Sequence, residues 1–357
     1  MIKVAIVGSQ GVPATYGGFE SLVENLLGKN CPDDISYTVF CSGLDMPDKR
    51  PEHKGGKLKY IPLHANGIQS VPYDIMSLCR CLKGYDVILL LGVSGCLFLP
   101  LFRLINHTKL IINIDGQEYK RDKWGKLARR ILKTSESLAV KFADTVIADN
   151  KGIQDYVTET YNRPSTLIAY GGDHVKRTLP PGFDKTVLSK HGIKQGDYAV
   201  SVCRIEPENN SETVLEAFSR TDRTLVYIGN WNKSEYGQNL RKKYSKFPNL
   251  KLLDAIYDLD VLYAIRSNAR MYVHGHSAGG TNPSLVEAMF FGIPILAYDV
   301  VYNRETTEHQ AYYFNNAENL IKEIERTDLD GTSMKEIAER RYRWKNISDE
   351  YTALFRN

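Results

Sequence analysis

The stretch HGHSAGGTNPSLVEAM, residues 274–289, decides how this chain is built. It follows a short apolar run at 269–273, so a buried strand is predicted to end near His274. Proline is favoured at the first position of a helix and asparagine just before it, so Asn282 and Pro283 predict a helix start. The stretch therefore predicts a strand, a glycine-rich turn and a helix.

The predicted turn is suited to binding an anion. A helix N-terminus presents free N–H groups and the positive end of its dipole, and Gly279 and Gly280 let the backbone approach a phosphate closely. Glu287 lies about one turn inside the helix, where its carboxylate can accept hydrogen bonds from sugar hydroxyls. The stretch therefore indicates a nucleotide-sugar site, and the alternative is an ordinary capped strand–turn–helix.

Length and composition are those of a soluble protein with two domains. The chain has 357 residues, 43% hydrophobic and 25% charged, and its net charge of +4 is too small to imply nucleic acid by itself. The six cysteines lack metal-ligand spacing and are expected to be reduced thiols of a cytoplasmic protein. The apolar run at 87–102 is interrupted by Gly92 and Pro100 and is too short to span a membrane.

The N-terminal half begins with a strand at 4–7, a glycine loop at 8–20 and a helical pattern from Leu22. The loop lacks the G-x-G-x-x-G spacing of a dinucleotide site, but it is long for a simple βα connection, which is the alternative. Apolar, β-branched strands alternating with helices predict a parallel sheet covered on both faces. Further strands of this half are expected near 36–40, 58–63, 86–90, 109–114 and 145–148.

The second half repeats the alternation after an irregular segment at 177–182. The predicted fold is therefore two doubly wound α/β domains that face each other across a cleft. Its strands are expected near 198–203, 225–229, 250–253, 271–273 and 294–297.

Two strand ends carry candidate polar groups. Asp115 and Glu118 follow the strand at 109–114, at the carboxyl end where open α/β sheets place their sites. Arg204 follows the strand at 198–203, where a guanidinium can clamp a diphosphate and neutralise a departing phosphate group. The alternative for Arg204 is a surface ion pair with Glu206 or Glu208.

A basic amphipathic helix is predicted after the Asp115 loop. Such a helix can approach anionic lipid or a lipid-linked diphosphate, and the alternative is a solvated charged face. Its basic side consists of Lys126, Arg129, Arg130 and Lys133, and its apolar stripe of Leu127, Ile131, Leu138 and Phe142.

Together these motifs resemble the GT-B fold retaining glycosyltransferases of the large nucleotide-sugar family four. The matching pieces are Gly17-Gly18, the Asp115 loop, 170–173, Arg204 and Glu287. More narrowly, segments 8–20, 204–210 and 279–289 are similar to bacterial β-1,4-rhamnosyltransferases of capsule and cell-wall polysaccharide synthesis, which use dTDP-β-L-rhamnose.

The resemblance spans the whole chain and implies two Rossmann-like domains. Residues 1–175 would be the acceptor-binding domain, with a C-terminal helix at 341–357 packing back on it and closing the molecule. Residues 176–340 would be the nucleotide-sugar-binding domain.

The resemblance also implies a role for each matched residue. The catalytic residues would be Arg204, Asp115 and Glu118. The donor would be bound by Gly17, Gly18, Arg204, Asn209, Gly279, Gly280, Thr281, Asn282 and Glu287. The acceptor would be bound by Tyr16, Phe19, Glu20, Arg121, Lys123 and Trp124.

Two positions depart from the broad family. Its Arg-x4-Lys pair would place a lysine where this chain has Asn209, so one diphosphate cation is missing. Its Glu-x7-Glu pair would place a sugar-contacting glutamate where this chain has Gly279, whereas the ribose-contacting glutamate is retained as Glu287. The loss is consistent with a different donor, such as a 6-deoxy sugar, and equally with a weakened or inactive enzyme.

The implied function is transfer of L-rhamnose, with retention, to a hydroxyl of a lipid-linked glycan acceptor. The alternatives are a UDP- or GDP-sugar donor, an epimerase or phosphorylase of the same fold, and a degenerate GT-B scaffold protein without activity. No metal, other cofactor or nucleic acid is expected. The expected location is the cytoplasm, peripheral at the inner face of the cell membrane, with helix 126–133 contacting anionic lipid.

Overall fold

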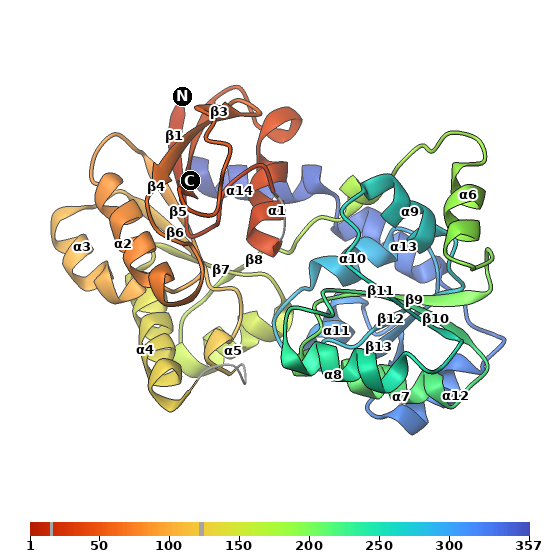
Figure 1. Cartoon of the computed structure of the whole chain (residues 1–357). Helices are drawn as coiled ribbons and strands as arrows, with labels where there is room; N and C mark the ends of the chain where they lie inside the picture. Colours follow the sequence, from red (N-terminus) through yellow and green to blue (C-terminus); the bar gives the residue numbers. More distant parts are fainter. Residues whose placement is uncertain (15–16, 121–124) are drawn as a thin grey trace. The chain divides into compact units, whose positions relative to one another are not determined.

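The computed structural model describes residues 1–14, 17–120 and 125–357 and divides the chain into two units (Figure 1). The N-terminal unit comprises Met1–Tyr170 and Trp344–Asn357, and the C-terminal unit comprises Gly171–Arg343. These limits lie within a few residues of the expected limits at 175 and 341. Each unit is built on its own, predominantly parallel sheet, which confirms the predicted α/β fold class.

The N-terminal unit has an eight-stranded sheet in the order β3-β4-β2-β1-β5-β6-β7-β8, parallel except for the β3–β4 pair. Its strands are β1 (Ile2–Val7), β2 (Ile35–Ser42), β3 (Glu52–His53), β4 (Gly56–Ile61), β5 (Val87–Leu91), β6 (Lys109–Asn113), β7 (Thr145–Ala148) and β8 (Thr166–Leu167). Its helices are α1 (Gly18–Leu26), η1 (Gly28–Asn30), η2 (Gly67–Gln69), α2 (Ser70–Arg80), η3 (Cys96–Phe98), α3 (Leu99–Ile105), η4 (Glu118–Lys120), α4 (Lys126–Phe142), α5 (Lys151–Tyr161) and α14 (Trp344–Arg356).

Both faces of this sheet are buried, because its central strands are apolar at successive positions and not only at alternate ones. Helices α1 and α14 pack on one face, where Tyr351 and Phe355 join the core formed with Val4, Ile6 and Leu89. The last helix of the chain therefore belongs to the core of the first domain. Figure 1 shows α14 beside α1.

The C-terminal unit has a six-stranded, wholly parallel sheet in the order β11-β10-β9-β12-β13-β14. Its strands are β9 (Tyr198–Val202), β10 (Thr224–Ile228), β11 (Leu250–Leu253), β12 (Met271–His274), β13 (Ile295–Tyr298) and β14 (Tyr312–Phe314). Its helices are η5 (Asp173–Val175), α6 (Phe183–Lys190), η6 (Pro207–Asn209), α7 (Ser211–Ser219), α8 (Glu235–Tyr244), α9 (Leu259–Ser267), α10 (Pro283–Met289), α11 (Val301–Thr306), α12 (Ala317–Ile324) and α13 (Thr332–Arg341).

The strand order reverses once in each sheet. In the N-terminal unit the chain builds outward from β1 to β2 and β4, then returns to add β5 on the other side of β1. In the C-terminal unit the same reversal separates β9 from β12. Helices on either side of such a reversal leave a crevice at the carboxyl ends of the strands, which is where ligands bind in open α/β sheets. The loops after β1, β5, β9 and β12 are therefore the favoured places for a site.

Helix α2 carries a buried carboxyl group, Asp74. Its Oδ2 accepts the N–H of Gly95 at 3.1 Å. Burial raises the pKa of Asp74 to about 8, against the smaller lowering effect of that hydrogen bond. The group is therefore mostly protonated at neutral pH.

Replacing Asp74 with Asn should make the free energy of unfolding less dependent on pH. Because the folded-state pKa lies above the unfolded one, the wild type loses stability as the pH rises from about 4 to about 8. Asn has no proton to lose, so the stability of D74N relative to wild type should increase over this window by on the order of a few kcal/mol. Urea denaturation at a series of pH values measures this difference.

Asp33→Asn, at an exposed carboxylate of the same unit, controls for the exchange of Asp for Asn. Parallel pH profiles for wild type and D74N would show that the carboxyl group of Asp74 is ionised in the folded protein, against the expected burial effect.

Candidate functional site

The switch point of the C-terminal sheet brings two polar loops together. One loop follows β9 and begins at Arg204, and the other follows β12 and holds the glycine-rich turn. Asn210 Nδ2 donates to the carbonyl of Gly275 at 2.8 Å, and Ser277 donates both its N–H and its hydroxyl to the carbonyl of Glu208. A Cβ at Gly275 would lie 2.2 Å from the Asn209 carbonyl oxygen, so the close contact requires glycine.

Arg204 lies where the sequence predicted it, just beyond the carboxyl end of β9. Its Nη1 is 3.4 Å from Glu206 Oε2 and its Nη2 is 3.9 Å from Glu208 Oε1, and the side chain is about one-third exposed (31%). These distances are longer than charge-assisted hydrogen bonds, so the guanidinium keeps donor capacity toward a ligand. The surface ion pairs considered from the sequence are present, and they leave the guanidinium able to reach an anion.

The side chain of Asn209 is buried and makes a hydrogen bond within its own loop. It is 1% exposed, and its Nδ2 donates to the carbonyl of Arg204 at 2.7 Å. The amide therefore fixes the backbone of the Arg204 loop. The expected donor contact of Asn209 stays a prediction.

The glycine-rich turn closes on helix α10 as predicted, with Asn282 as the N-cap. Its Oδ1 accepts the N–H of Ser284 at 3.0 Å. Gly279 has φ +107°, a conformation that favours glycine, and a Cβ there would meet none of the described residues within 4 Å. Gly280 is partly exposed beside it, whereas Thr281 is buried. Helix α10 has seven residues, so its dipole is short and side chains must contribute to any anion site.

Beneath the turn, β12 ends in two stacked imidazoles. The rings of His274 and His276 are 4.4 Å apart and nearly parallel, and His274 is 1% exposed. Burial lowers the pKa of His274 to about 3, so the ring is neutral at physiological pH. The sequence marked the motif but did not predict that its first histidine would be a core residue.

Glu287 is held by two partners that the sequence did not indicate. Its Oε2 accepts from Arg266 Nη1 at 2.7 Å, and its Oε1 lies 3.4 Å from His174 Nε2. Arg266 comes from helix α9 and His174 from η5, at the start of the unit. The contacts depend on the packing of α9 beside α10, and neither residue has a spacing in the sequence that would reveal it.

Burial alone would raise the pKa of Glu287, but Arg266 and His174 outweigh it and hold the pKa at about 2. The carboxylate is therefore charged at all physiological pH values. Arg266 is itself 2% exposed, so its charge depends on Glu287 for compensation.

Glu287→Gln should lower the free energy of unfolding at neutral pH by about 3 kcal/mol, because it leaves the buried charge of Arg266 unpaired. The folded-state pKa is below the unfolded one, so the contribution is present above about pH 4.5 and is lost as the pH falls toward 2. The difference between variant and wild type should therefore shrink in acid. Urea denaturation at neutral and acid pH measures it.

Glu318→Gln is the matched control, because Glu318 pairs with Arg220 at the surface of the same unit and should affect stability little. Equal stabilities of wild type and E287Q at neutral pH would show that Arg266 does not depend on the carboxylate.

In the N-terminal unit the glycine loop follows β1 at the other switch point. A Cβ at Gly8 would lie 2.0 Å from the Leu91 carbonyl oxygen, so glycine lets the ends of β1 and β5 approach each other. Glu20 Oε1 accepts the N–H of Gln10 at 2.7 Å. Glu20, which was expected to bind an acceptor, thus stabilises the glycine loop through this hydrogen bond.

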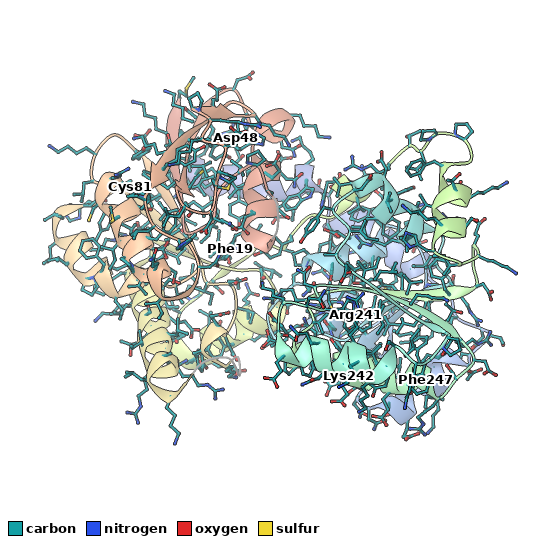
Figure 2. All side chains as sticks on the ribbon, in the orientation of Figure 1. Phe19, Asp48, Cys81, Arg241, Lys242 and Phe247 are labelled. Atoms are coloured by element: carbon teal, nitrogen blue, oxygen red, sulfur yellow. The ribbon has the colours of Figure 1, made fainter. Side chains whose placement is uncertain are left out.

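Gly17 and Gly18 begin helix α1, as the sequence predicted. Gly17 is the exposed N-cap with φ +118°, and a Cβ there would lie 2.0 Å from Glu20 Oε2. Phe19, labelled in Figure 2, is partly buried and packs against the core of the unit. The two glycines remain candidates for donor contact.

Asp115 occupies a turn of unusual backbone conformation after β6. Its φ is +51°, and that of the following Gly116 is +75°. The N–H of Asp115 donates to Asn113 Oδ1 at 3.1 Å, and Asn113 Nδ2 donates to the hydroxyl of Tyr351 at 3.1 Å. A positive φ at a non-glycine residue is uncommon and persists only where its surroundings hold it, as is often the case in functional sites.

The Asp115 loop continues into the short helix η4. Glu118 begins the short helix η4 and is half-buried. The predicted acceptor residues Tyr16, Arg121, Lys123 and Trp124 lie outside the residues that the structure describes.

Helix α4 differs from the expected basic helix at Lys133. The ammonium group of Lys133 lies 4.9 Å from the ring centroids of both Tyr156 and Tyr161, and 3.4 Å from the buried carboxylate of Glu136. Lys133 is therefore bound within the unit and is a poor candidate for contacting lipid. The basic side is limited to the first two turns of the helix.

Within residues 1–14, 17–120 and 125–357, no three or more His, Cys, Asp or Glu side chains are grouped so as to hold a metal ion. None of the helices in the described part of the chain is long and apolar enough to cross a membrane.

Two family models match the chain. Residues 1–173 match a domain of unknown function (DUF1972), and residues 184–344 match the glycosyl transferases group 1 family. Each match covers slightly less than half of the chain. Among curated proteins, none matches the sequence.

Solved structures match over the whole length. Sucrose-phosphate synthase from Thermosynechococcus elongatus is 16% identical with a TM-score of 0.82, covering 100% of this chain and 98% of that one. HepE from Anabaena, in complex with UDP and glucose, is 15% identical with a TM-score of 0.76, covering 99% of each chain. A trehalose-6-phosphate protein from E. coli bound with UDP-2-fluoro glucose is 10% identical with a TM-score of 0.70, covering 99% and 98%. At these identities the likeness shows the fold, GT-B.

Proposed function

We propose that this chain, whose C-terminal unit carries a group 1 glycosyltransferase domain, transfers a hexose from a nucleotide-sugar donor to a hydroxyl group of a glycan acceptor. The observation that carries the proposal is the convergence of the Arg204 loop and the glycine-rich turn at the switch point of the C-terminal sheet. A cation and flexible backbone amides there suit a diphosphate, and Glu287 suits the hydroxyls of a ribose.

The proposed reaction is a same-face displacement that retains the anomeric configuration. The bond from the sugar C1 to the diphosphate oxygen breaks, a bond from C1 to the acceptor oxygen forms, and the departing phosphate takes the acceptor's proton. Arg204 stabilises the charge on that phosphate, and the residues from Gly279 to Asn282 position the phosphate and sugar. Asp115 and Glu118 are proposed to orient the acceptor hydroxyl or the sugar. No step requires a metal or another cofactor.

We propose dTDP-β-L-rhamnose as the donor. The motifs at 8–20, 204–210 and 279–289 support this choice, as does Gly279 at the position of a sugar-contacting glutamate. Among the described residues no side chain fills the space in front of Gly279, so the turn is open on the side where that carboxylate would stand. A UDP-sugar donor is the second candidate, because HepE has been solved with UDP and glucose.

Arg204→Ala should lower kcat/KM for transfer from dTDP-rhamnose by about 100-fold or more, because it removes the cation nearest the proposed diphosphate. Arg220→Ala is the matched control. Arg220 also lies close to two glutamates of the same unit, Glu216 and Glu318. It is the C-cap of α7, whereas the Arg204 loop adjoins the N-terminal end of that helix. A donor-by-acceptor transfer assay, with the product linkage determined by NMR, measures the loss.

The same assay is run in EDTA, in which transfer should persist. Undiminished turnover by R204A, or loss of wild-type turnover in EDTA, would exclude the proposed mechanism.

Nucleotide binding identifies the donor class independently of transfer. Thymidine diphosphate should raise the melting temperature more than uridine or guanosine diphosphate at equal concentrations, because a ligand that binds the folded state stabilises it by mass action. A preference for uridine diphosphate would indicate a UDP-sugar donor in place of dTDP-rhamnose. No response to any of the three nucleotides would favour a scaffold protein without activity. Thermal-shift measurements on the full chain decide between these outcomes.

A lipid-linked oligosaccharide is the proposed acceptor, which places the reaction at a membrane surface. The exposed cations Lys126 and Arg130 at the start of α4 support contact with anionic lipid. The proposed location is therefore the cytoplasmic side of the cell membrane, with the chain bound peripherally.

A further inference from the structure

The exposed apolar side chains of the N-terminal unit are concentrated on three neighbouring helices, η3, α3 and α4. Six of the twelve large hydrophobic side chains that stand out as exposed among the described residues come from residues 97–105 and 127–131. We call these six the apolar surface: Leu97, Leu101, Leu104, Ile105, Leu127 and Ile131. The most exposed are Leu104 (74%) and Leu127 (73%).

These side chains remain exposed because the helices use their other faces for packing. Helix α3 buries Leu99 and Phe102, and α4 buries Ala139 and Val140. Helices η3 and α3 both contact α4, and Figure 1 shows α3 and α4 as neighbours. The apolar surface thus lies on helices that pack against each other, and its side chains stay exposed when the unit folds.

The two segments that carry the apolar surface are almost without negative charge. Residues 97–109 and 125–142, all of which the structure describes, contain a single carboxylate, Glu136, and it is buried. Lys126 and Arg130 are exposed next to Leu127 and Ile131. Arg103, on the same helix as Leu101 and Leu104, forms an ion pair with Asp144.

We infer that the apolar surface inserts into an anionic lipid bilayer, with Lys126 and Arg130 on the headgroups. Contiguous exposed apolar side chains are unusual on a soluble domain and mark an interaction surface. Leucine and isoleucine flanked by cations, with no exposed acid between them, match the acyl chains and the negative charge of such a bilayer. An acidic protein partner would satisfy the cations but would have no need of six projecting aliphatic side chains.

The biological purpose of lipid binding rests on the proposed function, whereas the binding itself does not. A lipid-linked acceptor carries its glycan at the headgroup level, so insertion of α3 and α4 would hold the N-terminal unit at that level. The binding itself requires neither a donor nor transfer, so it can be tested when the function fails.

The test is sedimentation of the full chain with vesicles of phosphatidylcholine alone or mixed with phosphatidylglycerol. Wild type should bind the anionic vesicles, and less well at high salt. The double variant Leu101→Ser/Leu104→Ser should partition at least about tenfold less. Lys126→Gln/Arg130→Gln should lose about fivefold for each cation removed.

Matched controls come from the same unit. Ile68→Ser removes a side chain that is 95% exposed on η2, away from the apolar surface in sequence, and Lys29→Gln/Lys57→Gln removes two exposed lysines of other elements. Both should bind vesicles like wild type. Unchanged melting temperatures verify that all variants fold.

Three outcomes would overturn the inference. Wild type could fail to bind anionic vesicles, the apolar variant could bind as well as its Ile68 control, or light scattering could show a dimer that the apolar variant dissolves. The last would assign the surface to a second copy of the chain. Vesicle binding without any nucleotide response or transfer would remove the proposed function and leave the inference standing.

Discussion

Parallel pairing is the constraint on which this structure depends. It makes parallel strands of a sheet end at the same edge. Loops that are distant in the sequence therefore become neighbours because of the strand order alone. In the C-terminal unit, β9 and β12 are adjacent although the chain passes through two other strands between them. Arg204 and the glycine-rich turn are thereby joined through Gly275 and Ser277. The polar site is a consequence of strand order.

A second constraint, that both faces of a parallel sheet must be covered, explains why the chain returns to its first unit. Helix α14 completes the face of the N-terminal sheet on which α1 packs, and Tyr351 from this helix meets Asn113 at the end of β6. Asn113 in turn holds the N–H of Asp115. The last residues of the chain thus help to fix a backbone turn more than two hundred residues earlier. The core of the unit and the geometry of its candidate loop cannot be separated.

Most of the strands, the glycine loops and the helix start at Pro283 were predictable, because each depends on local periodicity or backbone chemistry. The position of Arg204 beyond β9 followed for the same reason. The short strands β3 and β14 were not predicted. The partners of Glu287 were not predictable, since they depend on how α9 and η5 pack beside α10. The contacts of Lys133 were not predictable either. Its charge suggested a surface role, but its ammonium group lies against Tyr156, Tyr161 and Glu136. Sequence patterns identify the faces of a helix, whereas tertiary packing decides which side chains on a face contact other elements.

The structural role of Glu287 is compatible with the proposed ligand role. A carboxylate has about four lone-pair positions, and Arg266 Nη1, at 2.7 Å, donates to only one of its two oxygens, Oε2. His174, at 3.4 Å from the other oxygen, makes a longer and therefore weaker contact. In the proposed complex a ribose hydroxyl replaces His174 at Oε1, and the ion pair between Arg266 and Oε2 stays intact. Arg266 then acts as a positioning residue, because it keeps the carboxylate charged and oriented whether or not a donor is bound.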